Sequence, residues 1–170
     1  KIMQGLNFNQ LQNEPSLTQV LNLFEKYLAE KIINCARVGI VQEYDAINRV
    51  AKVQIANKLV TSIKTDGSQV MQDYAPIYAK VLFFGYGNIG ITSPIQSGTE
   101  GLLIFCDREI ESWYINGGVN HLAYNRTHDK TDAIFIAGLL SLPNMLESLQ
   151  NCLNIFNGNT NIQLDGATIV

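Results

Sequence analysis

The chain has 170 residues, of which 46% are hydrophobic, and its 12 basic and 15 acidic side chains give a net charge of −3 at pH 7. This composition excludes an intrinsically disordered protein, and no block of like charge marks a surface for nucleic acid or for anionic membranes. No apolar run approaches the roughly 20 residues of a membrane-spanning helix, and the first residues do not resemble a signal peptide. The start at Lys1 is typical of a fragment.

An amphipathic helix is predicted over residues 16–35, after an arm of 15 residues that is rich in Asn and Gln. Ser16 and Gln19 match a capping box at its start. Four apolar residues then recur at helical spacing, namely Leu17, Leu21, Phe24 and Leu28. Further apolar residues widen this face, which favours packing against the domain or against a partner.

Five short strands are predicted between residues 36 and 106, which fits a barrel of the OB type better than a layered α/β fold. The first two, 37–44 and 49–55, form a hairpin around a four-residue turn at 45–48. Alternation along residues 50–55 predicts one solvent-facing and one buried face of the second strand. Residues 57–72 predict an exposed loop or an edge hairpin. The last three strands are expected at residues 77–84, 89–93 and 102–106.

A short helix is predicted after the fifth strand, because Ile110, Trp113 and Tyr114 share one helical face and glycines follow. We expect Trp113, the only tryptophan, to lie in the core and to hold this helix on the barrel. Residues 119–130 predict a polar connection, and residues 132–137 a further apolar strand.

A second helix is predicted at residues 143–156, with Pro143 at its start. Leu142, Leu146, Leu149, Leu153 and Phe156 recur on one face at spacings of three and four. Two heptads are too few to establish a coiled coil, so a short self-associating helix is the hypothesis. The tail, residues 157–170, returns to strand alternation.

Three groups of residues could carry chemistry, but the sequence around each of them favours a structural role. Residues 85–90 match the dinucleotide pattern G-x-G-x-x-G, but no helical period follows, so we interpret them as a turn between strands. His121 and His128, with Asp129 and Asp132, lack metal-ligand spacing and favour structural hydrogen bonding. Three distant cysteines, Cys35, Cys106 and Cys152, predict free buried thiols. We therefore expect no catalytic, cofactor or metal site and no enzyme.

The main rival function is a module that binds single-stranded nucleic acid. OB barrels bind single strands by stacking bases on aromatic side chains in a basic groove. The chain offers aromatic residues at Tyr74, Tyr78, Phe83, Phe84 and Tyr86. Only Lys64 and Lys80 lie near them in the sequence, so the electrostatic half of such a site is weak, and nucleic acid is not the expected partner.

The residues from Gly98 to Leu139 resemble the N-terminal barrel domain of central spike proteins of contractile phage tails, the baseplate assembly protein V type. The resemblance is carried by residues 101–108, by Glu111 to Trp113 with Gly117 and Gly118, by 126–129, by 131–133, and by Gly138 and Leu139. The chain departs from this family in its leading helix, in the helical pattern at 143–156, and in ending at Val170 before any long β-helix or metal-bearing tip.

The resemblance implies a structural protein of the virion, in the tail baseplate, assembled in the host cytoplasm. Its OB-fold domain would attach a spike to a tail hub or tube protein, and a distal tip beyond this chain would meet the host envelope. Three chains would meet at a neck and continue into a trimeric β-helix. The expected trimer interface comprises Leu142, Leu146, Leu149, Leu153, Phe156, Ile162, Leu164 and Ile169.

The expected domain organisation follows from these elements. Residues 1–35 form an N-terminal arm and helix, residues 36–139 the OB-like barrel, and residues 140–170 the neck helix and the start of the spike β-structure. The fold class is mainly β with flanking helices. The implied partners are two further copies of the chain and a hub protein, with no small-molecule substrate.

Overall fold

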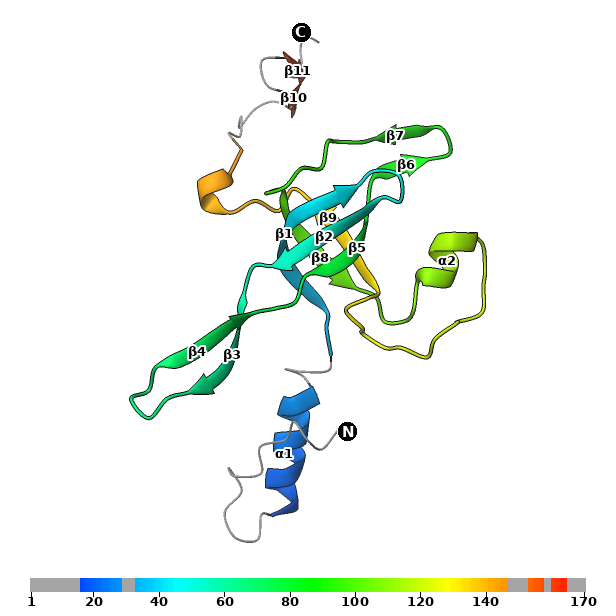
Figure 1. Ribbon diagram of the computed structural model, residues 1–170. Coiled ribbons are helices and arrows are strands. Elements are labelled where there is room, and N and C mark those ends of the chain that lie inside the picture. The colour runs from blue at the N-terminus through cyan, green and yellow to red at the C-terminus, as the bar shows by residue number, and fades with distance from the viewer. Residues whose placement is uncertain (1–15, 29–32, 147–152, 158–159, 165–170) are drawn as a thin grey trace. The chain divides into compact units, whose positions relative to one another are not determined.

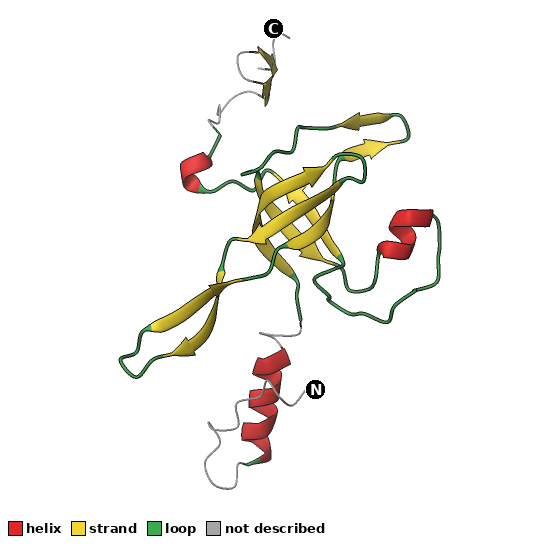
Figure 2. Cartoon of the chain, viewed as in Figure 1, coloured by secondary structure: helices red, strands yellow, loops and turns green. Residues whose placement is uncertain are grey.

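The computed structural model describes residues 16–28, 33–146, 153–157 and 160–164. The chain divides into two compact units, Lys1–Leu139 and Leu140–Val170. The first unit contains a closed barrel of five strands, from which two hairpins project (Figure 1). Figure 2 shows that strands dominate the described chain. No helix among the described residues is long and apolar enough to cross a membrane.

The barrel is formed by β1 (Ala36–Asp45), β2 (Val50–Ile55), β5 (Ile77–Val81), β8 (Glu100–Phe105) and β9 (Ala133–Ala137). Around the barrel the order is β1-β2-β5-β9-β8, and β8 pairs with β1 to close it. Only β5 and β9 are parallel; the other four neighbouring pairs are antiparallel. The predicted mainly-β fold with a five-stranded barrel is therefore confirmed at this level.

The membership of the barrel differs from the prediction at one strand. Residues 133–137, expected as an additional strand, are the fifth barrel strand, whereas 89–91 lie in a side hairpin. The physical reason is what each segment can bury. Ala133 and Phe135 are fully buried in the barrel interior, whereas no residue of β7 (Ile89–Ile91) is buried.

The barrel interior is filled by alternate residues of each strand, as a small closed barrel requires. On β2 the residues Ala51, Val53 and Ile55 are buried and their neighbours are half-buried, as the sequence predicts. Phe135 and Leu103 are the largest fully buried apolar side chains. The rest of the core comprises Val41, Ile77, Ala79, Val81, Ile95, Phe105 and Ala133.

Two hairpins leave the barrel, and each is formed by neighbouring strands. β3 (Lys58–Ile63) pairs with β4 (Gln69–Asp73), which confirms the edge-hairpin alternative for residues 57–72. β6 (Phe84–Tyr86) pairs with β7, so the glycine-rich motif is a turn between strands, as predicted. No residue of β4, β6 or β7 is buried. Both hairpins therefore expose their side chains in the single chain.

The helix α1 (Leu17–Tyr27) confirms the first part of the predicted N-terminal helix. The Ser16 hydroxyl accepts a hydrogen bond from the backbone N–H of Gln19, and the Gln19 side-chain oxygen accepts one from the backbone N–H of Ser16, which completes the capping box. The helix is shorter than predicted: residues 33–35 are not helical, and residues 29–32 lie outside the described chain. Buried Asn34 instead donates a hydrogen bond to the carbonyl of His128, at 2.9 Å.

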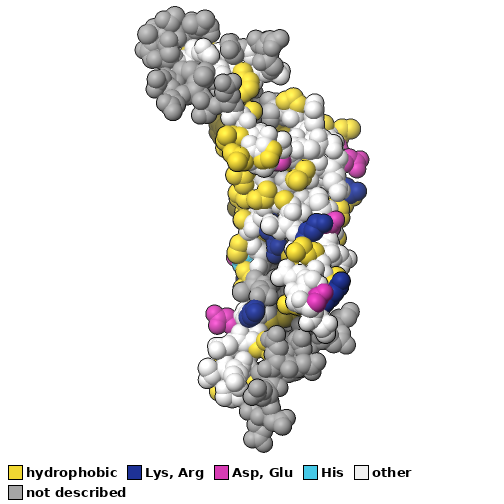
Figure 3. Space-filling view, turned by 90° about the vertical axis from the view of Figure 1, so that its left-hand side faces the viewer, with side chains coloured by type: hydrophobic (Ala, Val, Ile, Leu, Met, Phe, Trp, Pro, Cys, Tyr) yellow, Lys and Arg dark blue, Asp and Glu magenta, His cyan; other side chains and the backbone are white. Residues whose placement is uncertain are grey.

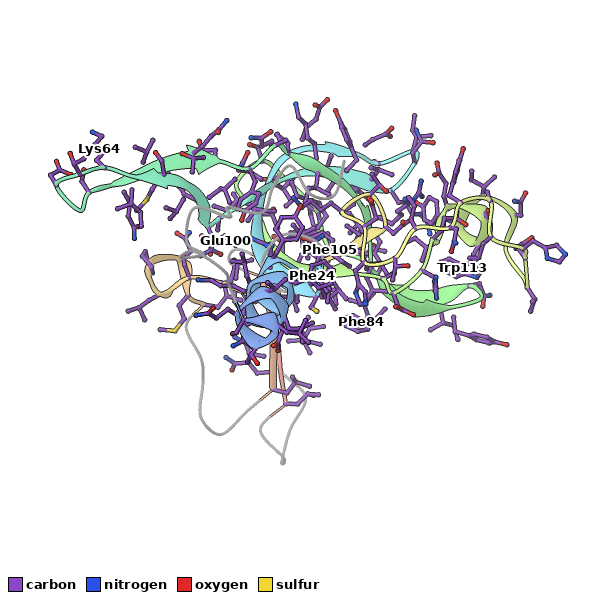
Figure 4. All side chains as sticks on the ribbon, turned by 90° about the horizontal axis from the view of Figure 1, so that it is seen from below. Phe24, Lys64, Phe84, Glu100, Phe105 and Trp113 are labelled. Carbon is purple, nitrogen blue, oxygen red and sulfur yellow. The ribbon has the colours of Figure 1, made fainter. Side chains whose placement is uncertain are left out.

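The helix α2 (Glu111–Asn116) confirms the predicted short helix, but the prediction for Trp113 is wrong. Trp113 is 56% exposed in the single chain. Figure 4 places it at the outside of the molecule, on the α2 segment. Tyr114 makes the contact instead, since its hydroxyl donates to the carbonyl of Asn48 in the turn between β1 and β2. One position along the helix decides which aromatic ring faces the barrel.

The second unit contains a 3-10 turn, η4 (Leu142–Asn144), and a hairpin of β10 (Leu153–Asn157) and β11 (Thr160–Leu164). The predicted helix over 143–156 is therefore wrong at 153–156, and only its first two residues fall in the 3-10 turn; residues 147–152 lie outside the described chain. The apolar spacing is compatible with both structures, and the ladder between β10 and β11 selects the strand. The expected strand character of the tail is confirmed at Thr160–Leu164.

Candidate interaction surfaces

The residues considered for chemistry do not converge on one another. Within the described chain, no group of three or more His, Cys, Asp or Glu side chains could hold a metal ion. His121 is exposed, whereas His128 is half-buried. The Nδ1 atom of His128 lies 3.1 Å from the carbonyl oxygen of Asn34, and its Nε2 lies 3.2 Å from a carboxylate oxygen of Asp107. His128 thus connects the start of β1 to the loop after β8, which is a structural arrangement.

The carboxylates of this region are each bound by neighbouring groups. Glu109 is buried and accepts hydrogen bonds from the backbone of Ser112 at 2.7 Å and of Ala123 at 3.2 Å. The bond from the Ser112 backbone is the main reason why the pKa of Glu109 lies below its usual value. Asp129 accepts from the backbone and hydroxyl of Thr131, which likewise lowers its pKa. These hydrogen bonds to the carboxylates fix the conformation of the loop.

Asp132 and Arg126 form the central ion pair of this loop. Asp132 is 1% exposed, and it accepts two hydrogen bonds from the guanidinium of Arg126, at 2.9 and 3.0 Å. It also accepts from the backbone of Ile110, just before α2. The hydrogen bonds to Asp132 raise the pKa of Arg126 above its usual value. The pair therefore ties the 126–132 segment to the start of α2 and gives this side of the barrel a defined shape.

The two described cysteines are free, and neither is fully buried, which corrects the expectation of buried thiols. Cys35 is exposed and Cys106 is half-buried; Cys152 lies outside the described chain. Burial raises the pKa of the Cys106 thiol, so it is a poor nucleophile at neutral pH.

The outside of the barrel has one apolar side, which we call the apolar wall. It comprises the outward residues of β1, β8 and β9: Ala36, Val38, Ile40, Leu102, Ile104, Ile134 and Ile136. These residues pair across the strands, as Val38 does with Leu102 and Leu102 with Ile136. Val38, Ile40 and Ile104 remain more than a third exposed. This outer apolar face was not predicted from the sequence.

The opposite side of the barrel is more polar. Its outward residues on β2 and β5 include Lys52, Gln54, Tyr78 and Lys80. Figure 3 shows a face of the molecule on which hydrophobic side chains gather, with few charged side chains among them. An apolar outer side opposite a polar one is typical of a protein that packs against another surface.

The β6–β7 hairpin is a second apolar surface. Phe84, Tyr86, Ile89 and Ile91 are between 69% and 91% exposed. Residues 81–99 contain no charged side chain, so the two strands of this hairpin supply no basic residue beside their aromatic rings. Lys64 lies at the tip of the other hairpin, as Figure 4 shows. Arg49, from the turn before β2, lines a pocket together with Phe84 and Tyr86. One arginine does not make the basic groove that base stacking needs, so this arrangement fits contact with a protein better.

The β10–β11 hairpin carries an uncovered apolar face. Leu153 pairs with Leu164, and Ile155 with Ile162, so these four side chains share one face. They are between 37% and 59% exposed. Phe156 lies one position away and therefore projects from the opposite face. Among the expected interface residues, the structure thus groups Leu153, Ile162 and Leu164, adds Ile155, and separates Phe156.

Two of the other expected interface residues, Leu142 and Leu146, lie outside this hairpin. They are exposed, in and just after the 3-10 turn. Leu149 and Ile169 lie outside the described chain. Ile155 could have been found from the sequence, because it alternates with Leu153 along a strand. The helical interpretation of this segment concealed it.

Residues 38–138, which include the five barrel strands except the first two residues of β1, match the family described as phage protein Gp138 N-terminal domain. A comparison with curated proteins gave no match.

Proposed function

Because the chain belongs to the Gp138 N-terminal domain family of phage proteins, we propose that it is a structural component of the phage tail baseplate. In this role it is a trimeric central spike or hub-attachment protein, used in penetration of the host envelope. The family match supports a virion-associated role, and the resemblance of residues 98–139 to spike proteins supports the position in the tail. The role is mechanical, and no catalytic step is part of it.

The single observation that carries this proposal is the uncovered apolar face of the β10–β11 hairpin. A hairpin of two strands is at best marginally stable in water unless another surface covers it. Burial of the exposed parts of Leu153, Ile155, Ile162 and Leu164 would contribute about 1 kcal/mol for each side chain. Three copies around one axis would cover all three faces at once and would continue as an intertwined β-structure.

The barrel is the attachment domain in this proposal, and we assign it to the OB type. The strands β1, β2 and β5 are neighbours in chain order. The pairing of β8 with β1 closes the barrel, and β5 and β9 form its one parallel pair. The apolar wall and the β6–β7 hairpin are the surfaces available for contacts with neighbouring subunits or with the tail hub. A spike needs such fixed contacts because it transmits a load along its axis.

The experiment is to measure the mass of the assembly by size-exclusion chromatography with multi-angle light scattering. We expect three times the 18.9 kDa mass of one chain at micromolar concentration. Ile155→Asp should convert the trimer to monomer, because it places three charges at the axis without a partner. Circular dichroism of the variant should retain the barrel signal.

Phe156→Asp is the matched control, since it adds the same charge one residue further on the opposite face of the hairpin. It should remain trimeric. A wild-type monomer, or dissociation by both variants to the same extent, would contradict the proposed arrangement.

A further inference from the structure

The helix α1 presents an apolar stripe that stays exposed in the described chain. Leu17, Leu21 and Phe24 lie along this stripe and are 74%, 55% and 41% exposed, and α1 has no buried residue. The helix has 11 residues, and an isolated helix of this length is marginal in water even with a good cap. Most of the stability of such a helix comes from packing of its apolar face, so the stripe requires a partner surface.

The spacing of the apolar residues on α1 is that of a coiled coil. Four residues follow one another at spacings of four, three and four, and they take alternating d and a positions of a heptad written abcdefg: Leu17, Leu21, Phe24 and Leu28. Val20 and Tyr27 then fall at g, beside the a positions. An apolar face of a, d and g is typical of a helix inside a bundle, whereas a two-stranded coil needs only a and d.

The remaining positions of α1 are polar apart from Leu23 at c. Polar residues occupy every b, e and f position of the helix: Thr18, Gln19, Asn22, Glu25 and Lys26. One glutamate and one lysine give this side no net charge. A helix that lies on an anionic membrane carries several basic residues on its polar side, so a membrane surface is not the partner.

The proposed trimer supplies a partner that matches the stripe. Rotation about a threefold axis keeps the direction of a helix along that axis, so equivalent helices run parallel and present the same face to one another. Both a positions of α1 are leucines and not the β-branched residues that favour two-stranded coils. At the flanking e and g positions the only charged residue is Glu25, so parallel copies do not place like charges at facing e and g positions.

The connection between α1 and the barrel is hydrogen-bonded on both sides. The N–H of Ile33 donates to the carbonyl oxygen of Leu28 at 2.9 Å. The next residue, Asn34, donates through its side chain to the carbonyl oxygen of His128, also at 2.9 Å. A contact among helices is thereby passed on to the start of β1, which is a useful property in a protein that carries a load.

The size of this contact decides how it forms. The exposed parts of Leu17, Leu21 and Phe24 offer roughly 250 Å² of apolar surface per helix. Three helices together offer roughly 750 Å², which is half the area of a standard specific interface. The helices alone would therefore not hold three chains together. Copies already joined through their β10–β11 hairpins have an effective concentration on the order of millimolar, at which a small contact forms.

We propose that α1 packs with the α1 helices of two further copies as a parallel three-helix bundle, with Leu17, Leu21, Phe24 and Leu28 facing the axis. The inference rests on the proposed trimer, and it adds a second contact between the chains, on the N-terminal side of the barrel in the sequence. It also assigns a role to the N-terminal helix, which joins the entry points of the three barrels.

The first test is a disulfide cross-link in the whole chain, with alanine in place of the native cysteines Cys35, Cys106 and Cys152. Leu21→Cys places a thiol at an a position, where parallel helices bring equivalent residues together. Mild oxidation should give a covalent dimer on a non-reducing gel, with one chain of each trimer left unlinked. Asn22→Cys, one residue further and on the polar side, is the matched control and should not cross-link. Equal yields from both variants, or no link through position 21, would overturn the bundle.

The apolar wall of the barrel is the rival partner for α1. A double variant, Leu21→Cys with Ile104→Cys, distinguishes the two, because Ile104 pairs with residues of both β1 and β9 at the centre of the wall. We expect links between two copies of position 21, identified by mass spectrometry of proteolytic fragments. Links between positions 21 and 104 in their place would assign α1 to the wall and overturn the bundle.

The second test measures the strength of assembly. Leu21→Asp places three charges at the axis without a partner, so the concentration at which half of the trimer dissociates should rise about tenfold. Asn22→Asp adds the same charge on the polar side and should stay within about twofold of the wild type. Sedimentation velocity measures both midpoints, and circular dichroism should retain the barrel signal, since α1 has no buried residue. Equal effects of the two variants would contradict the proposed face.

The mass of the wild type separates this inference from the proposed function. A wild-type monomer would contradict the proposed trimer and the bundle together. A wild-type trimer that Ile155→Asp dissociates but Leu21→Asp does not weaken would contradict the bundle alone. The reverse result, dissociation by Leu21→Asp and not by Ile155→Asp, would support the bundle and contradict the contact between the β10–β11 hairpins.

Discussion

At the scale of single residues, the barrel depends on glycine where its wall approaches a large side chain. A Cβ atom added at Gly101 would meet the carbonyl oxygen of Ile136 and the ring of Phe135. Phe135 is fully buried and belongs to β9, the strand that pairs with β8 at this point. Neither the backbone oxygen nor the packed ring can move away cheaply, because the interior of a protein is close-packed.

We therefore expect Gly101→Ala to destabilise the barrel by about 1 to 3 kcal/mol, the usual cost of overpacking. Unfolding by urea, followed by circular dichroism, measures the change. Gly67→Ala is the control, since Gly67 lies in the β3–β4 turn with φ of +84° and open space around it. Its cost should be about 1 kcal/mol, from backbone strain alone. An unchanged midpoint for Gly101→Ala would contradict the close contact with Phe135.

At the scale of elements, the parts of the chain differ in how they are held. The barrel strands bury alternate side chains, whereas α1 has no buried residue. Asn34, between α1 and β1, makes two contacts with His128. Its side-chain amide donates to the carbonyl oxygen of His128, and its own carbonyl oxygen lies 3.1 Å from the Nδ1 atom of the His128 ring. The structural boundary of the barrel therefore lies before Asn34.

Deletion of residues 1–32 should accordingly leave the barrel folded, with a thermal midpoint within about 4 °C of that of the whole chain. Deletion of residues 1–35 removes Asn34 as well, and it should cost a further 1 to 2 kcal/mol or so, since the 128 loop loses its partner. Differential scanning calorimetry of the two truncated chains decides between these outcomes. A large loss of stability in the first truncation would show that α1 packs on the barrel.

At the scale of the whole molecule, exposed apolar side chains gather on several surfaces. The apolar wall, the β6–β7 hairpin and the face of β10–β11 lie on separate elements, and each keeps side chains that are more than a third exposed. A protein that acts as a single chain rarely exposes so many apolar side chains on defined faces. This distribution is the physical reason for proposing an assembly.

The apolar wall gives a prediction of its own. Ile104→Lys should weaken the assembly, because a lysine at the centre of the wall must be desolvated when another subunit covers it, while in the free chain it extends into water. Sedimentation velocity over a range of concentrations measures the dissociation. Lys52→Glu changes charge on the opposite side of the barrel and should assemble normally. Normal assembly of the Ile104 variant would exclude the wall as a subunit contact.

Local patterns predicted much of this protein. The alternation along residues 50–55, the turn after Asp45 and the capping box at Ser16 each depend on neighbours within a few residues, and each is confirmed. The family resemblance of residues 98–139 also came from the sequence, and the match to a phage protein domain confirms its coarser part.

Tertiary structure alone decided which segments close the barrel, which structure residues 153–156 adopt and whether Trp113 is buried. These outcomes depend on pairing with a second segment: β5 with the distant β9, β10 with the neighbouring β11, and Tyr114 with the turn at Asn48. A short apolar run satisfies a helical and a strand period equally well, so its own sequence does not select between them. The choice is made by the hydrogen bonds and the buried surface that a second segment supplies.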